Sequence, residues 1–74
     1  MSDDPDEILD VREIDGPPLF DILNALAALD EGETLLLIND FEPIPLYDVL
    51  DERGFEHATE EVADAEWHVE ITNP

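Results

Sequence analysis

The chain has 74 residues, of which 22 are acidic and two are basic, so its net charge is −20. It has no cysteine, which excludes a disulfide and a thiolate metal site. Its only cations, Arg12 and Arg53, are too few to neutralise nucleic-acid phosphates, so direct nucleic-acid binding is excluded. No apolar run approaches the length of a membrane span, and nothing at the N-terminus resembles a signal peptide. We therefore expect a cytoplasmic domain with no membrane contact.

The acidic residues are spread from Asp3 to Glu70 and occur in every segment. Repulsion among so many like charges opposes a compact fold at low salt, whereas at molar salt the Debye length falls to ~3 Å and screens it. The composition thus predicts a protein from a halophile. A nucleic-acid mimic or an acidic lure for a basic partner is the alternative, but such proteins usually concentrate their charge on one face or in a tail.

The first predicted strand and helix follow a polar N-terminal segment. Residues 1–7 have too little apolar surface to pack and are predicted to be a disordered acidic lead-in, so that residues 8–74 form a single domain. Ile8 to Ile14 alternates as a half-buried strand does. The prolines that follow Gly16 suit a first helical turn, and apolar side chains recur at helical spacing from Leu19 until Gly32 ends the helix.

The second half of the chain supplies the remaining elements. Thr34 to Ile38 is a short apolar run, typical of a central strand covered on both sides. A loop from Asn39 to Pro45 precedes a short helix from Leu46 to Arg53, with Gly54 just beyond. Two strands follow, Phe55 to Val62 and Trp67 to Ile71, joined by a hairpin at residues 63–65.

This order of elements, βαβαββ, predicts the fold class. Strand–helix–strand units favour parallel strands, while the last two strands form a hairpin, so the four-stranded sheet should be mixed. Both helices must cover the same face of the sheet to share one core. We therefore predict an α/β protein with the architecture of a two-layer α/β sandwich.

Two histidines, His57 and His68, lie on consecutive predicted strands. Together with Glu56, Glu66 or Glu70, they would supply the ligands of a metal site. Two unpatterned histidines in a sheet are more often structural, and we expect neither a metal nor a cofactor. Paired carboxylates such as Asp40 and Glu42 arise from composition alone in so acidic a chain, and no catalytic residue is predicted.

Three aromatic side chains lie off the predicted core stripes: Phe20, Phe41 and Tyr47. They are either residues at the edge of the core or parts of a contact surface, and both interpretations stay open. The loop before the second helix and the start of the first helix each follow a parallel strand at its C-terminal end, so they should be neighbours. With Gly16 and Pro17, the three aromatics form the candidate interaction surface for an unknown protein partner.

In order along the chain, the strings 9–11 (LDV), 16–19 (GPPL), 29–35 (LDEGETL) and 39–40 (ND), followed by Pro43, resemble the TusA/SirA-like proteins, small βαβαββ domains best known as sulfur carriers. The resemblance covers almost the whole chain after the lead-in, through segments that lie in the same order and spacing. It is closer still to an uncharacterised branch of that superfamily, a domain of unknown function also found beside hemerythrin-like modules. The strings that carry this second resemblance are 9–12 (LDVR), 32–35 (GETL), 39–47 (NDFEPIPLY) and 67–71 (WHVEI).

The chain departs from the sulfur carriers at the position that matters for their chemistry. Their Cys-Pro-x-Pro motif opens the first helix, whose N-terminus activates the thiol. Here Gly16 stands at the cysteine position, Pro17 still fits the motif and the second proline is displaced to Pro18. The resemblance thus implies a noncatalytic interaction domain, expected to be monomeric. A sulfur-relay or metal-associated protein acting through other residues is the alternative.

Overall fold

The structure is a computed structural model that describes residues 4–16 and 18–74. Strands and helices follow one another in the predicted order, with one additional short 3-10 helix, η1, after the first strand. The elements are β1 (Glu7–Asp10), η1 (Val11–Glu13), α1 (Leu19–Ala27), β2 (Thr34–Asn39), α2 (Ile44–Glu52), β3 (Glu56–Ala63) and β4 (Glu66–Thr72).

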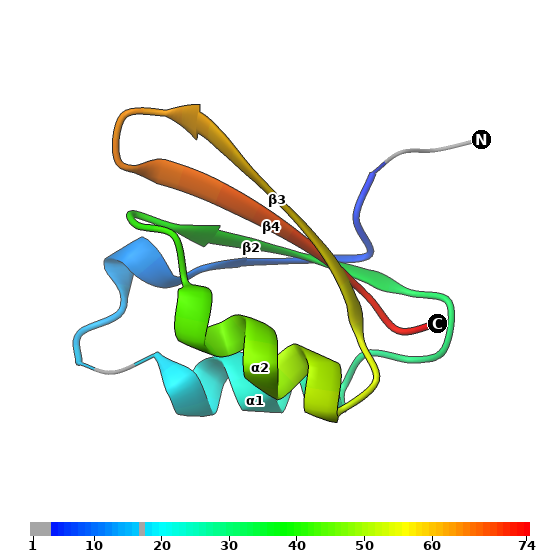
Figure 1. Ribbon diagram of the computed structural model, residues 1–74. Coiled ribbons are helices and arrows are strands. Elements are labelled where there is room, and N and C mark those ends of the chain that lie inside the picture. Colours follow the sequence, from blue (N-terminus) through cyan, green and yellow to red (C-terminus); the bar gives the residue numbers. More distant parts are fainter. Residues whose placement is uncertain (1–3, 17) are drawn as a thin grey trace.

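The four strands form one mixed sheet in the order β1-β2-β4-β3. The β1 and β2 strands are parallel, because α1 carries the chain back between them, and the β2–β4 and β3–β4 pairs are antiparallel. Both helices lie on the same side of the sheet (Figure 1). The predicted two-layer α/β sandwich with a mixed four-stranded sheet is confirmed.

The hydrophobic core lies between the two helices and one face of the sheet. Alternate residues of β2 and β4 point into it, so Leu37 and Val69, which are paired across the two strands, are both fully buried. Burying such a side chain stabilises the fold by about 1.5 to 3 kcal/mol. The buried apolar residues are Val11, Ile22, Leu26, Leu29, Leu35, Leu37, Leu46, Leu50, Val69 and Ile71.

The prediction that the second strand is covered on both faces is wrong. Leu36 and Ile38 point to the face of the sheet away from the helices, and both are only half-buried. The unbroken apolar run instead reflects the central position of β2, where side chains of the neighbouring strands partly cover the open face.

The first strand is shorter than predicted. It ends at Asp10, and the next three residues form η1 instead of continuing to Ile14. The cause is local: Asp10 caps η1 by accepting a hydrogen bond from the backbone N–H of Arg12, and the side chain of Arg12 folds back onto the same carboxylate. Val11 is nevertheless buried in the core.

The first helix also ends early, at Ala27, five residues before Gly32. The residues between them form a turn with its own hydrogen bonds: Glu33 donates its N–H to the Asp30 carbonyl, and its side chain accepts from the Asp30 N–H. Gly32 has a φ of +86°, which glycine adopts readily, but it serves this turn instead of capping the helix.

The remaining boundaries differ by one or two residues. The second helix starts at Ile44, which places Pro45 in its first turn, where the missing N–H costs nothing. The hairpin turn is at Asp64 and Ala65, with a bulge in β3 just before it.

The N-terminal boundary needs a correction as well. Glu7, assigned to the lead-in, belongs to β1, and Asp6 is tied to Thr34 by two hydrogen bonds. The first three residues of the predicted lead-in, 1–3, lie outside the described residues.

The two faces of β2 provide a direct test of where the stability lies. Leu37→Ala should lower the free energy of unfolding by about 2 to 5 kcal/mol, because it leaves a cavity in the core. Leu36→Ala, next to it but on the open face, should cost clearly less. Denaturant unfolding of both variants at high salt measures the difference, and equal losses would show that the open face is also a packed core.

Candidate functional site

The candidate site lies where β1 and β2 end. Both strands run in parallel, so the loops that follow them leave the same edge of the sheet, the edge at which open α/β sheets commonly bind ligands. The loop after β1 leads through η1 to the start of α1, and the loop after β2 leads to the start of α2. The predicted proximity of these two segments is confirmed, because residues from both line one groove.

This apolar groove is open to solvent and has a volume of about 280 Å³. Its walls come from the starts of α1 and α2 and from the loop between β2 and α2. Except for one asparagine, its residues are apolar or proline. They are Pro18, Leu19, Ile22, Asn39, Phe41, Pro43, Pro45, Leu46 and Val49.

Exposed apolar side chains gather around the groove. Phe41 lines it and is 58% exposed, although it belongs to a chain in which nearly a third of the residues are charged. Most of the large apolar side chains that are exposed in the described chain lie at the helix starts or in the loop before α2: Leu19, Phe20, Phe41 and Ile44. Apolar groups concentrated at one place on an otherwise charged surface are typical of an interaction site.

The five candidate residues are not all part of this groove. Phe41 lines it, while Phe20 is exposed on α1 beside the lining residue Leu19. Gly16 is exposed two residues before Pro18, the N-cap of α1, and has a φ of +86°. Pro17 lies outside the described residues.

Tyr47 points elsewhere, toward β3. Its ring stacks on His57 with centroids 4.7 Å apart, and its hydroxyl oxygen lies 2.7 Å from Thr59 Oγ1 and 3.1 Å from Glu42 Oε2. Glu42 follows Phe41 in the chain, so Tyr47 ties the loop of the groove to β3. Tyr47 is therefore a positioning residue for the groove and is absent from its lining.

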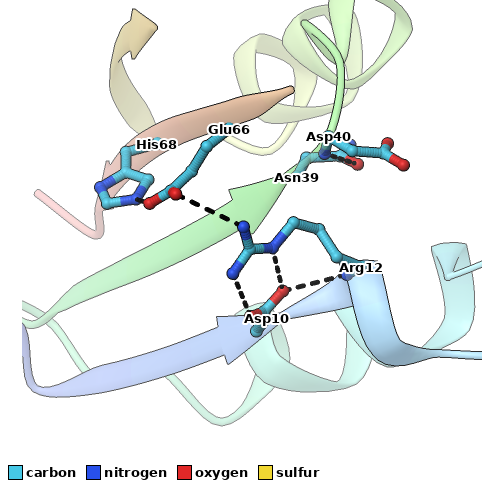
Figure 2. Close-up of polar contacts among 6 residues, drawn as sticks. All are labelled: Asp10, Arg12, Asn39, Asp40, Glu66 and His68. Atoms are coloured by element: carbon cyan, nitrogen blue, oxygen red, sulfur yellow. Dashed lines mark hydrogen bonds and ion pairs between the residues drawn. The ribbon is translucent and has the colours of Figure 1, made fainter. Parts of the chain in front are cut away.

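Sequence reasoning did not assign Asn39 to the site. Asn39 is only 5% exposed and lines the apolar groove, and its side-chain Oδ1 accepts a hydrogen bond of 2.8 Å from the N–H of Asp40 (Figure 2). The signal was available: Asn39 shares the two-residue alternation of Leu35 and Leu37, which points it to the helix side of the sheet.

A polar cluster occupies the open face near the same edge of the sheet (Figure 2). Arg12 donates to both carboxylate oxygens of Asp10, at 3.0 and 2.8 Å, and lies 3.5 Å from Glu66, which in turn contacts His68 at 2.8 Å. The hydrogen bond from Arg12 holds the pKa of Asp10 below its ordinary value. Arg12 is thus engaged by two carboxylates and joins η1 to the start of β4.

The two histidines lie on the paired strands β3 and β4 but on opposite faces of the sheet. His57 is paired with the buried Ile71 and faces α2, where it lies 3.6 Å from Asp51. His68 is paired with Glu60 and faces the opposite side of the sheet. Within residues 4–16 and 18–74, no group of three or more His, Asp or Glu side chains is arranged to hold a metal ion.

The open face carries a second hollow, of about 550 Å³, to which Glu60, Glu70 and His68 contribute. Its apolar floor is small and includes Leu36 and Ala58. Glu60 and Glu70 are exposed and stay solvated, so this hollow has the character of the ordinary acidic surface. The apolar groove remains the candidate site.

The family model described as "Uncharacterized conserved protein (DUF2249)" matches residues 8–73. The chain belongs to the DUF2249 family. No curated protein and no solved structure matches it at a significant level. In the described part of this DUF2249 chain, neither helix is long and apolar enough to cross a membrane.

The environment of Tyr47 predicts a pH dependence that no other side chain obscures. Partial burial, the largest cause, raises the pKa of the Tyr47 phenol, and the neighbouring Glu42 carboxylate adds to this. The neutral phenol is therefore favoured in the folded state, so its contribution to stability is complete below about pH 10 and is lost as the pH rises through the higher folded pKa.

Absorbance of the phenolate measures this directly, since Tyr47 is the one tyrosine and the chain has neither lysine nor cysteine. The midpoint for the folded DUF2249 domain should lie above that of the chain in denaturant. Unfolding free energies of the wild type should fall over the same pH range, and those of Tyr47→Phe should not. A folded midpoint equal to the denatured one would contradict the assigned environment.

Proposed function

We propose that this DUF2249 chain is a noncatalytic interaction domain that binds a protein partner through the apolar groove. The observation that carries the proposal is the exposed Phe41 beside Leu19 at the groove, in a chain of net charge −20. Exposed apolar surface is unfavourable in water, and a groove of this kind provides the anchoring core of an interface. The partner is a protein in this proposal, because Arg12 is engaged by carboxylates and Arg53 alone cannot bind nucleic acid.

The proposal includes a TusA-like scaffold without the sulfur-carrier cysteine. The βαβαββ order and the convergence of two loops at the start of α1 agree with this. Gly16, at the position of that cysteine, precedes the helix N-cap and has a left-handed backbone that disfavours a side chain. We propose further that the domain is monomeric and works in the salty cytoplasm of a halophile.

Partner capture tests the groove. Phe41→Ala should greatly reduce capture of a partner from a lysate kept at high salt, as the loss of an anchor residue does. It should change the free energy of unfolding by no more than about 1 kcal/mol, because Phe41 is exposed. Ile8→Ala is the matched control, since Ile8 is 62% exposed but lies on β1, away from the groove lining. Equal capture by the wild type and both variants would contradict the groove, and unfolding of Phe41→Ala would make Phe41 a core residue.

Salt dependence tests the proposed environment. The domain should be folded in molar KCl and should loosen near about 50 mM, where the Debye length is longer than ~10 Å and repulsion among the carboxylates is no longer screened. Dispersion of the backbone amide signals in NMR spectra reports this change. Equally good dispersion at both salt concentrations would show that the core alone holds the fold.

A further inference from the structure

One polar side chain, that of Asn39, lines the apolar groove and keeps an uncommitted hydrogen-bond donor. Asn39 is about 95% buried, and its Oδ1 atom is occupied by the N–H of Asp40, so its Nδ2 atom carries the two remaining hydrogens. Nδ2 has no hydrogen-bond partner within residues 4–16 and 18–74. No fully buried side-chain polar atom in the described chain lacks a partner, so this Nδ2 atom is accessible to solvent.

Resting on the proposed function, we infer that the groove binds an extended peptide segment of the partner, with an apolar side chain against Phe41 and the preceding or following backbone carbonyl accepting a hydrogen bond from Asn39 Nδ2. An apolar groove with one convergent polar group fixes the orientation of what it binds. Displacing solvent from this amide without supplying an acceptor would leave a buried donor unpaired.

The surrounding negative charge favours a neutral hydrogen-bond acceptor over a charged one. Asp40 and Glu42 flank the lining residue Phe41 in the chain, within a protein of net charge −20. A carboxylate ligand would be repelled by these groups, whereas a neutral carbonyl is not. The start of α1, which no side chain caps, contributes the positive end of its helix dipole to the same groove.

The size of the groove and the accessible donor favour an extended segment. About 280 Å³ in an open groove accommodates one or two side chains and is smaller than the enclosed pockets that small ligands usually occupy. The carbonyls within a helix are bonded to N–H groups of the same helix, so only an extended stretch or a helix end presents a free one. Charge complementarity with a chain of net charge −20 favours arginine or lysine next to the apolar side chain.

The test begins with a random peptide library displayed on phage and selected against the immobilised full chain at a salt concentration that keeps it folded. Enriched peptides should carry a bulky apolar residue flanked by basic ones. A synthetic peptide of the enriched sequence, with both ends capped, is then titrated into the ¹⁵N-labelled chain. The chain has only three side-chain amides, those of Asn24, Asn39 and Asn73, so the Asn39 NH₂ signals are resolved and assignable.

We expect these NH₂ signals to shift on binding while those of Asn24, which is exposed on α1, do not. Asn39→Asp keeps the acceptor for Asp40 but removes the donor, and it should weaken binding roughly three- to ten-fold, the value of one hydrogen bond. Asn24→Asp adds the same charge outside the groove lining and is the matched control. The NH₂ shifts in the wild type decide the question even where Asn39→Asp fails to fold.

The outcomes separate this inference from the proposed function. In one outcome, Phe41→Ala abolishes peptide binding, but binding leaves the Asn39 signals unchanged and Asn39→Asp binds as tightly as the wild type. This result would overturn the carbonyl contact and leave the groove as the contact surface. Enriched peptides that are helical when bound would overturn the extended segment. Failure to enrich any peptide that depends on Phe41 would overturn the extended segment, whereas the proposed function fails only if capture of the partner is also independent of Phe41.

Discussion

The structure depends on a balance between one small core and strong like-charge repulsion. Ten buried apolar side chains, packed between two helices and one face of the sheet, hold together a chain of net charge −20. A domain of this size buries only roughly 60% of the surface that its unfolded chain exposes, so the core has little excess stability with which to oppose repulsion. Screening by salt is therefore a physical requirement of the proposed environment, because it weakens the repulsion without changing any contact in the core.

The like-charge repulsion also bears on the few places where opposite charges meet or apolar surface is exposed. Arg12 lies between Asp10 and Glu66, where it reduces repulsion between the end of β1 and the start of β4. Exposed ion pairs stabilise proteins weakly, so the arrangement positions the loop toward α1 more than it strengthens the fold. In contrast, the exposed Phe41 carries no charge and gains nothing from salt screening, and the proposed function assigns it to an interaction.

The sequence pattern predicted the elements whose periodicity is set by the core. The alternation in β4 and the helical spacing in α1 reflect which side chains face the core, and the parallel β1–β2 pair then determines which loops meet. For this reason the proximity of the Phe41 loop to the start of α1 was predictable. The early ends of β1 and α1 were not, because each is set by local hydrogen bonds, of Asp10 with Arg12 and of Asp30 with Glu33, that compete with the periodic pattern.

The directions of the side chains in the candidate site were predicted less well from periodicity than the elements themselves. Tyr47 follows the buried Leu46, so helical geometry alone left its direction open, and the deciding contacts with His57 and Thr59 come from β3, which is distant in sequence. Asn39 was overlooked for the opposite reason: its direction was fixed by alternation, but a polar residue at the end of an apolar run is normally assigned to the loop. Its burial at the groove requires a hydrogen bond, which Asp40 supplies for the oxygen only. The nitrogen has no such partner among the described residues, and Asn39 lines the apolar groove, so the groove combines apolar walls with one polar side chain that can fix the orientation of what it binds.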